Sequence, residues 1–266
     1  MNQSIFLLFL TLLIHLPSTI GQPPPDSSKF VRVLSFNILH GATTKGDFDL
    51  DVIAKVIQDA KPDLVALQEV DFRTRRAKNY DLTLELASRT ELIPLFGRAM
   101  PFSGGEYGEG VLSRYSFLQT RNVALPFTPG NEPRAALEIL TVLPSGDTIA
   151  FVGTHLDHLP DETDRIAQVT HINEVFSQNS YPTILAGDLN ATPASTPIRI
   201  LEKVWTPAYG ATGPQPTYPS SKPAKTIDYV MYQSADRWRV IFTEVIADPV
   251  ASDHCAVLVV LELLSP

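Results

Sequence analysis

Residues 181–190 read YPTILAGDLN, and this stretch decides what kind of fold the rest of the chain has to form. Its apolar part, Tyr181–Ala186, predicts a buried strand, and the strand is followed at once by Asp188 and Asn190. Two side chains two residues apart point to the same side if the chain stays extended. Taken alone, the segment fits a reactive site and a polar turn before the next helix about equally well.

Strands and helices alternate on both sides of this stretch, which predicts an α/β domain. The helices predicted from apolar periodicity are Asp49–Ala60, Tyr80–Thr90, Glu162–Gln178 and Ile198–Val204. The strands predicted are Phe30–Asn37, Leu64–Val70, Ile93–Met100, Gly110–Leu118, Ala135–Leu143, Thr148–Leu156, Thr226–Tyr232, Trp238–Ile246 and Cys255–Leu263. The glycine-rich Ser103–Gly110 and the proline-rich Pro207–Pro223 are predicted to be loops. The sequence contains no internal repeat and no second apolar block behind a long linker. We therefore expect one domain over residues 30–264.

Several predicted strands end in a residue that can bind a metal, transfer a proton or hold a phosphate. The residues in such positions are Asn37, Glu69, His155 with Asp157, Asp188 with Asn190, Asp228, and Asp253 with His254. In α/β proteins ligand sites gather at one edge of the sheet, on loops that a rigid scaffold holds. Asn37 alone reads as a turn residue, but a carboxylate such as Glu69 after the apolar run Leu64–Leu67 must be paired, solvated or bound to metal. The set as a whole predicts one site.

These residue types indicate a site for a hard metal ion with histidines beside it. Mg²⁺ takes oxygen ligands, usually one or two carboxylates together with water and substrate phosphate. The candidate ligands are Asn37, Glu69, Asp188, Asn190 and Asp253, and the lack of a Cys/His cluster argues against structural zinc. Because imidazole titrates near neutrality, His155 and His254 are the candidates for moving protons, with His40 and His158 as second choices.

Composition limits the class of protein. The chain of 266 residues has 44% hydrophobic and 19% charged residues, which is globular rather than disordered composition. Its formal net charge of −8 argues against broad, non-specific binding of nucleic acid, although a bound cation and a few arginines can still attract a phosphate locally. Cys255 is the single cysteine, so no disulfide can form within the chain, and a buried strand thiol is expected.

The N-terminus reads as an export signal. Ile5–Leu16 is nearly continuously apolar, and the small residues Thr19 and Gly21 follow it. We therefore predict a signal peptide over residues 1–22, a proline-rich linker over 23–29, and a secreted or periplasmic protein. An uncleaved N-terminal membrane anchor is the alternative.

Six short motifs, taken together and in order, resemble the endonuclease/exonuclease/phosphatase superfamily, which includes deoxyribonuclease I. The motifs are Ser35-Phe36-Asn37, Leu67-Gln68-Glu69-Val70-Asp71, Thr154-His155-Leu156, Gly187-Asp188-Leu189-Asn190, Ile227-Asp228-Tyr229 and Ser252-Asp253-His254. The resemblance extends from about residue 30 to 263. It implies a four-layer sandwich, with two mixed β-sheets packed face to face and helices outside, and hydrolysis of a phosphoester with Mg²⁺ or Mn²⁺.

The resemblance also implies a role for each motif residue. Glu69 would be the principal metal ligand, helped by Asn37 and Asp253. Asp188 and Asn190 would orient the attacking water and the phosphate, or hold a second metal. His155 and His254 would be the acid–base and phosphate-contacting pair, with Asp228 orienting His254.

Other residues are assigned by resemblance to deoxyribonuclease I-like members, in which a Tyr-x-Glu precedes the equivalent strand. Glu109 would then orient His155 and Tyr107 would contact phosphate, the alternative being that Glu109 is an exposed loop charge. The candidate phosphate or structural arginines are Arg73, Arg134 and Arg165. The pair Arg165 and Gln168 also resembles members that act on sphingomyelin and other lipid phosphodiesters.

The expected activity is that of a secreted phosphodiesterase that acts on nucleic acid or on a lipid or sugar phosphate. Exonuclease III-like repair enzymes carry Asn where His155 stands, so a role in base-excision repair is disfavoured. A phosphomonoesterase and a non-catalytic binding module on the same scaffold are the alternatives. The latter is disfavoured because every core motif position is filled. We expect a monomer without an obligate protein partner.

Overall fold

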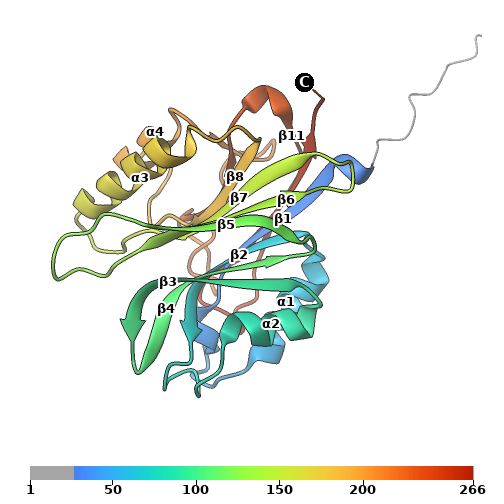
Figure 1. Cartoon of the computed structure of the whole chain (residues 1–266). Helices are drawn as coiled ribbons and strands as arrows, with labels where there is room; N and C mark the ends of the chain where they lie inside the picture. Colours follow the sequence, from blue (N-terminus) through green and yellow to red (C-terminus); the bar gives the residue numbers. More distant parts are fainter. Residues whose placement is uncertain (1–26, 266) are drawn as a thin grey trace, which may run out of the picture.

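The structure, a computed structural model, describes residues 27–265 and is built in four layers. Figure 1 shows two β-sheets packed face to face, with α1 and α2 on one outer face and α3 and α4 on the other. This arrangement confirms the predicted sandwich of two mixed sheets.

The elements largely follow the predicted order. The helices are α1 (Leu50–Ala60), α2 (Leu82–Thr90), α3 (Thr163–Phe176) and α4 (Thr196–Leu201), with 3-10 turns at Ser27–Lys29, Leu39–Gly41 and Ala235–Arg237. The strands are β1 (Phe30–Asn37), β2 (Leu64–Phe72), β3 (Ile93–Phe102), β4 (Gly105–Ser113), β5 (Phe117–Ala124), β6 (Ala135–Val142), β7 (Thr148–His155), β8 (Thr183–Asp188), β9 (Thr206–Pro207), β10 (Asp228–Tyr232), β11 (Trp238–Ile246) and β12 (Ala256–Leu263).

Each sheet has a parallel pair of strands near its centre. The first sheet has the order β11-β12-β1-β2-β4-β3 and the second the order β5-β6-β7-β8-β10-β9. β1 runs parallel to β2, and β7 runs parallel to β8. Their neighbours β12 and β10 are antiparallel to β1 and β8. Four strands therefore finish, and two strands begin, at the same end of the sandwich.

Alternating side chains fill the three cores between the layers. In β8, Ile184 and Ala186 face the other sheet, whereas Leu185 packs under α3 and α4. In β1, Val31 and Val33 face inward between the sheets, and Leu34 and Phe36 contact the α1/α2 layer. Because strands buried on both faces read as continuous apolar runs, the sequence identified these strands without showing which residue faces which layer.

Capping residues set the limits of the best-predicted helix. The Asp49 side chain accepts hydrogen bonds from the backbone N–H groups of Asp51 at 3.0 Å and Val52 at 3.4 Å, which starts α1. Lys61 ends it in the left-handed conformation, with φ of 48°, directly before Pro62.

Two sequence predictions for the segment 103–118 were wrong. The predicted loop Ser103–Gly110 is instead the start of β4, paired with β3 on one side and β2 on the other. Glycine is used here for close strand approach, since a Cβ at Gly108 would lie 2.0 Å from the Gly97 carbonyl oxygen. The predicted strand Gly110–Leu118 is interrupted after Ser113, and β5 joins the second sheet.

Most of the N-terminal segment lies outside the residues that the structure describes. The predicted signal peptide, residues 1–22, lies outside the described residues, and of the predicted linker only Ser27–Lys29 is described, as a short 3-10 turn. No helix between residues 27 and 265 is both long and apolar enough to cross a membrane. Cys255 is buried, as expected, and lies directly before the last strand. Burial raises the pKa of its thiol to about 11.

A first testable prediction concerns the tight contact between β7 and β8. A Cβ at Gly187 would lie 2.0 Å from the Thr154 carbonyl oxygen, so Gly187→Ala must push these strands apart. We expect a loss of about 1–3 kcal/mol in unfolding free energy, measured by urea denaturation. Since His155 and Asp188 come next on the two strands, kcat should fall as well.

The matched control is Gly146→Ala in the turn between β6 and β7. There the added methyl group meets open space, and only the positive φ of 88° opposes it. This variant should lose stability while its kcat remains unchanged. Equal kcat values for the two variants would contradict the link between strand contact and site geometry.

Candidate active site

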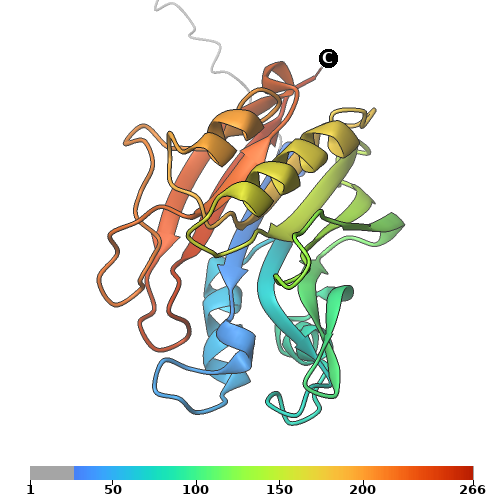
Figure 2. The same cartoon turned by 90° about the vertical axis from the view of Figure 1, so that its left-hand side faces the viewer.

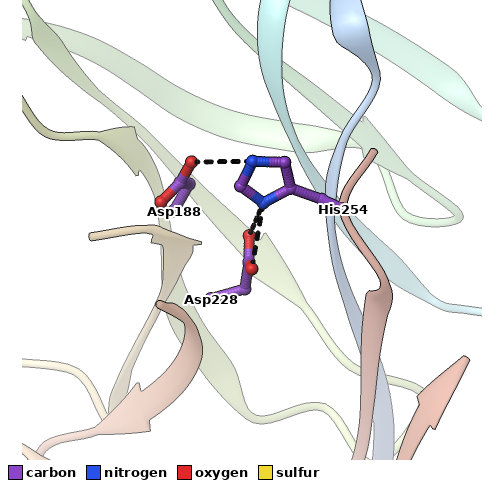
Figure 3. Close-up of side chains that lie close together, drawn as sticks. All are labelled: Asp188, Asp228 and His254. Atoms are coloured by element: carbon purple, nitrogen blue, oxygen red, sulfur yellow. Dashed lines mark hydrogen bonds and ion pairs between the residues drawn. The ribbon is translucent and has the colours of Figure 1, made fainter. Parts of the chain in front are cut away.

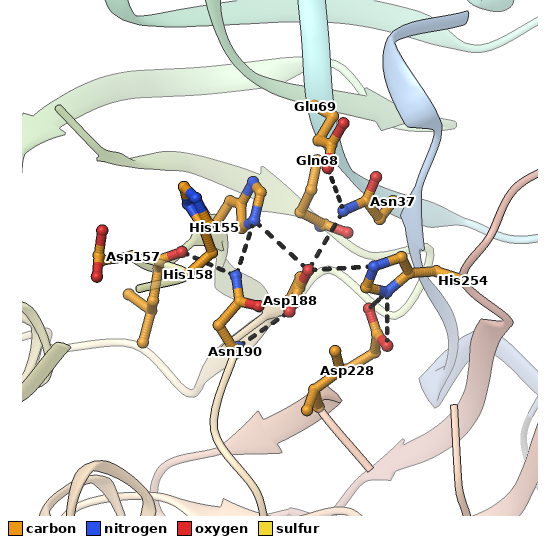
Figure 4. A network of polar contacts seen from close by, with 12 residues as sticks. Asn37, Gln68, Glu69, His155, Asp157, His158, Asp188, Asn190, Asp228 and His254 are labelled. Carbon is orange, nitrogen blue, oxygen red and sulfur yellow. Dashed lines mark hydrogen bonds and ion pairs between the residues drawn. The ribbon is translucent and has the colours of Figure 1, made fainter. Parts of the chain in front are cut away.

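The strand ends meet at one end of the sandwich, as the sequence predicted. Figure 2 shows the loops before β10 and β12 gathered at the end of the molecule opposite the C-terminus. They lie where β1, β2, β7 and β8 finish, and there Asn37, Glu69, His155 and Asp188 are brought together with His254 (Figure 4).

Asp188 is the centre of this network. Its Oδ2 lies 3.2 Å from Asn37 Nδ2, 3.4 Å from His155 Nε2 and 3.7 Å from His254 Nε2. Its Oδ1 accepts the backbone N–H of Asn190 at 2.9 Å. Asp188 is 1% exposed, and burial together with the nearby Asp228 carboxylate raises its pKa. A buried carboxylate with a raised pKa is suited to accept a proton.

His254 forms a hydrogen-bonded relay with Asp228 (Figure 3). Its Nδ1 lies 3.1 Å from each Asp228 oxygen, and Thr217 Oγ1 donates to Asp228 Oδ2 at 2.6 Å. Burial opposes the charged form of His254, but the Asp228 carboxylate outweighs it and raises the pKa of His254 to about 10. The imidazole is therefore protonated at neutral pH, with Nε2–H directed to Asp188.

Glu69 is presented by a break in the regular strand. The pairing of β2 with β4 shifts between Leu67 and Val70, and Glu69 has a φ of 57°. Its Oε1 accepts from Asn37 Nδ2 at 3.2 Å, and its Oε2 lies 3.3 Å from His40 Nδ1. Burial alone would raise its pKa, but the contact with His40 and the Asn37 hydrogen bond lower the pKa of Glu69 to about 2. Glu69 is thus a fixed negative charge.

The residues present fit a hard divalent cation. The carboxylates of Glu69, Asp188 and Asp253 line one cavity and offer oxygen ligands. The Asn37 amide turns its nitrogen to Glu69 and Asp188, and its oxygen accepts the Leu39 N–H at 3.1 Å. Burial raises the pKa of Asp253, and its Oδ1 is buried without a hydrogen-bond partner among the described residues. A cation would satisfy that oxygen and lower the repulsion among the carboxylates.

A second cluster with metal-ligand character overlaps this one. Asp188, Asp228 and His254 each bring one ligand atom within 4.8 Å of the others. Because both oxygens of Asp228 already accept hydrogen bonds, the trio serves better as a proton relay, and Asp188 is the member that can also contact a cation.

His155 has a different partner from the one the resemblance implies. Arg134 Nη1 lies 3.0 Å from His155 Nδ1, so an arginine contacts the ring that Glu109 was expected to orient. Glu109 lies within β4 and is 0% exposed, so the alternative of an exposed loop charge was wrong. Burial raises its pKa well above the usual range, and its carboxyl oxygens have no hydrogen-bond partner among residues 27–265.

A cavity of about 740 Å³ opens above this network. The predicted site residues that line it include Glu69, Tyr107, Asp188, Asn190 and Asp253, together with His155 and His254. Asn37, Asp228 and Glu109 do not line it. The first two support lining residues from below, through the hydrogen bonds to Glu69 and His254.

Several cavity residues were missed from the sequence. Arg76 lines the wall, donates to Asp71 from Nε at 2.7 Å and from Nη2 at 2.8 Å, and lies 4.5 Å from the centre of the Phe102 ring. Tyr218 also lines the cavity, with its ring 4.7 Å from that of His254. Both lie in irregular segments where neither spacing nor motif marks them, although the run of arginines at 73–76 was a signal.

The three predicted arginines have three different places. Arg73 does not line the cavity, and its guanidinium packs over Phe72. Arg165 lines it but donates to the backbone carbonyls of Asp157 and Leu159. Gln168 accepts the Asp157 N–H at 2.9 Å, so this pair on α3 holds the loop after β7. Arg134 is 2% exposed and contacts histidines.

Comparison with known proteins agrees with this geometry. The model of the Endonuclease/Exonuclease/phosphatase family matches residues 34–254. Among solved structures, the chain is similar to an endonuclease/exonuclease/phosphatase from Beutenbergia cavernae, with a TM-score of 0.74 and 24% identity over 88% of this chain and 72% of that chain.

Two further structures have named activities or ligands. The human Nocturnin catalytic domain with bound sulfate has a TM-score of 0.68 and 20% identity, over 89% of this chain and 95% of that one. A mannosyl-6-phosphatase from Bacteroides thetaiotaomicron has a TM-score of 0.67 and 17% identity, over 88% of this chain and 100% of that one. At these identities the likeness shows the fold.

Proposed function

We propose that this chain, which belongs to the endonuclease/exonuclease/phosphatase family, hydrolyses a phosphodiester with the help of Mg²⁺ or Mn²⁺. One observation carries the proposal. Asp188, His254 and Glu69 line one cavity, where burial raises the pKa of Asp188, the Asp228 carboxylate raises the pKa of His254, and hydrogen bonds lower the pKa of Glu69. Fold stability alone does not require three ionisable groups in one buried place.

The metal site would be formed by Glu69 and Asp253, with Asp188 and Asn190 beside them. When bound there, a divalent cation supplies charge stabilisation for the phosphoryl oxygens and lowers the pKa of bound water. His40 holds the outer oxygen of Glu69, and Asn37 holds both Glu69 and Asp188, so these carboxylates are positioned before any ligand arrives.

The protein groups have complementary tasks in the attack of water on phosphorus. Asp188 orients the water and accepts its proton, since the pKa of its carboxyl is raised by burial. His254, charged and oriented by Asp228, donates from Nε2 to a phosphoryl oxygen as negative charge develops there. As the P–O ester bond breaks, the same N–H gives its proton to the oxygen of the leaving alcohol. His155 stays neutral, because burial and the positive charge of Arg134 both lower its pKa.

The substrate class and the cell compartment are parts of the same proposal. A phosphodiester is the leading substrate, from nucleic acid or from a lipid or sugar phosphate. Export is supported by the apolar run Ile5–Leu16 and the small residues after it.

The test is turnover by the purified protein in Mg²⁺, Mn²⁺ or EDTA. The substrates are bis-p-nitrophenyl phosphate, p-nitrophenyl phosphate, plasmid DNA and sphingomyelin, which separate diesters from monoesters and nucleic acid from lipid. We expect metal-dependent turnover, fastest on a diester. Hydrolysis that persists in EDTA would refute the metal requirement, and faster turnover of the monoester would identify a phosphomonoesterase. A folded protein that binds metal and turns over none of the four would favour the binding module.

A further inference from the structure

One buried guanidinium, that of Arg134 directly before β6, connects a histidine at the end of β7 with another just after it. Arg134 Nη1 lies 3.0 Å from Nδ1 of His155, and Nη2 lies 3.2 Å from Nδ1 of His158. Glu132 Oε1, 3.4 Å from Nη1, fixes the position of this guanidinium. Figure 4 shows the two imidazoles side by side, with His155 nearer to Asp188.

The chemistry of arginine decides which ring nitrogens carry hydrogen. A guanidinium has five N–H donors and no acceptor, so each Nδ1 that it contacts must offer a lone pair. A neutral imidazole has one donor and one acceptor nitrogen. In both rings the hydrogen therefore has to be on Nε2, the atom directed away from Arg134.

Two hydrogen-bond donors, one from Arg134 and one from Asn190, contact the His155 ring. Asn190 Nδ2 lies 3.0 Å from His155 Nε2 and also donates to the Leu156 carbonyl at 3.0 Å. One neutral ring cannot accept at both nitrogens. The charged arginine forms the stronger hydrogen bond, and Arg134 has no acceptor to present. The Asn190 amide can turn to present its oxygen to Nε2–H, a turn that gives up its hydrogen bond to the Leu156 carbonyl. Nε2–H can then also reach Asp188 Oδ2, at 3.4 Å.

His158 is an exposed side chain on a tightly held backbone. It lines the same cavity as His155 and His254. On either side of it, the Asp157 N–H donates to Gln168 Oε1 at 2.9 Å, and the Leu159 N–H donates to Asp157 Oδ2 at 3.0 Å. Arg165 binds the carbonyls of these two neighbours. A polar side chain presented by a rigid loop is already positioned for a ligand.

We propose that Arg134 is a positioning residue that keeps His155 and His158 protonated at Nε2, and that His158 donates this N–H to the phosphoryl group of the substrate. The proposal rests on the proposed function in taking a phosphoryl group as the ligand. It gives the cavity a third imidazole donor besides those of His155 and His254.

The first arm of the test measures the tautomers directly. Long-range ¹H–¹⁵N correlation spectra of histidine-labelled protein, recorded without metal and with Mg²⁺, distinguish Nε2–H from Nδ1–H rings. We expect Nε2–H for both residues. In Arg134→Lys the charge remains, but an ammonium lacks the planar fork, so at least one of the two rings should lose its single tautomer. Nδ1–H rings in the native protein, or unchanged spectra in the lysine variant, would overturn the role of Arg134.

The second arm measures the affinity for inorganic phosphate by calorimetry in the presence of Mg²⁺. His158→Phe keeps the ring shape without a donor, and we expect its Kd to rise about 5- to 10-fold, the effect of one neutral hydrogen bond. His158→Gln keeps an N–H group at a similar reach and should recover most of the affinity. Because His158 is exposed, both variants should fold normally. An unchanged Kd in His158→Phe would rule out the contact with phosphate.

Neither arm requires turnover, so the two proposals can fail separately. The expected spectra and phosphate affinities in a protein that hydrolyses none of the test esters would remove the proposed function and support the roles of Arg134 and His158. Conversely, metal-dependent hydrolysis with Nδ1–H rings would leave the function in place and overturn this inference.

Discussion

His254→Asn should lower kcat by about 10²- to 10⁴-fold, the range found when a positioned acid or base is removed. The asparagine side chain can still offer an N–H to Asp228, close to where Nδ1 of the histidine stands, so that carboxylate keeps a partner. What is lost is Nε2–H, the donor directed at Asp188 and the cavity. The measurement is kcat and KM on the best ester of the panel, together with the melting temperature.

The matched control is His171→Asn on the outer part of α3. The His171 side chain is 34% exposed and pairs only loosely with Glu174, at 3.7 Å. This variant should retain native kcat. If the two variants differed from the native protein by similar factors, the assignment of His254 to the chemical step would have to be abandoned.

Glu69→Gln should weaken binding of Mg²⁺ and Mn²⁺ by at least about 10- to 100-fold, a loss that even the partner of a metal ligand can cause. The substitution keeps the shape of the side chain and removes a charge that is present at every pH well above 2, since the pKa of Glu69 is about 2. Titration calorimetry with each metal gives the Kd without reference to turnover.

Glu91 provides an unusually close control for this change. Like Glu69 it is a glutamate with a φ of 57°, but it is the C-cap of α2 and is exposed. Glu91→Gln should leave metal affinity unaltered. Native metal affinity in Glu69→Gln would exclude Glu69 as a ligand and direct attention to Asp188 and Asp253.

The sequence predicted the composition of the site better than its internal order. Asn37, Glu69, Asp188 and His254 were found because each follows or precedes an apolar run, and strand ends converge in this kind of fold. Their mutual contacts depend on the stacking of two sheets, which no local pattern encodes. The same limit explains Arg134, whose place between two imidazoles results from the pairing of β6 with β7.

A high glycine content also led to a wrong prediction of secondary structure. Ser103–Gly110 has the composition of a loop, yet it begins a strand, because its glycines permit close contact with β3. Arg76 and Tyr218 could not be selected from sequence, since one is placed by its pairing with Asp71 and the other by packing on His254. Residues that reach a site through irregular backbone need the fold before they can be recognised.

The backbone around the cavity carries a cost that bears on any attempt to engineer this scaffold. Leu39, His40, Glu69 and Asn190 all have φ between 46° and 57°, a conformation that costs a non-glycine residue about 1–3 kcal/mol. Glycine at these places would relieve the strain, and at His40, Glu69 and Asn190 it would also delete side chains that form the site. A laboratory selection for heat resistance alone would therefore enrich inactive variants. Screens on this protein should demand turnover and thermal survival in the same round.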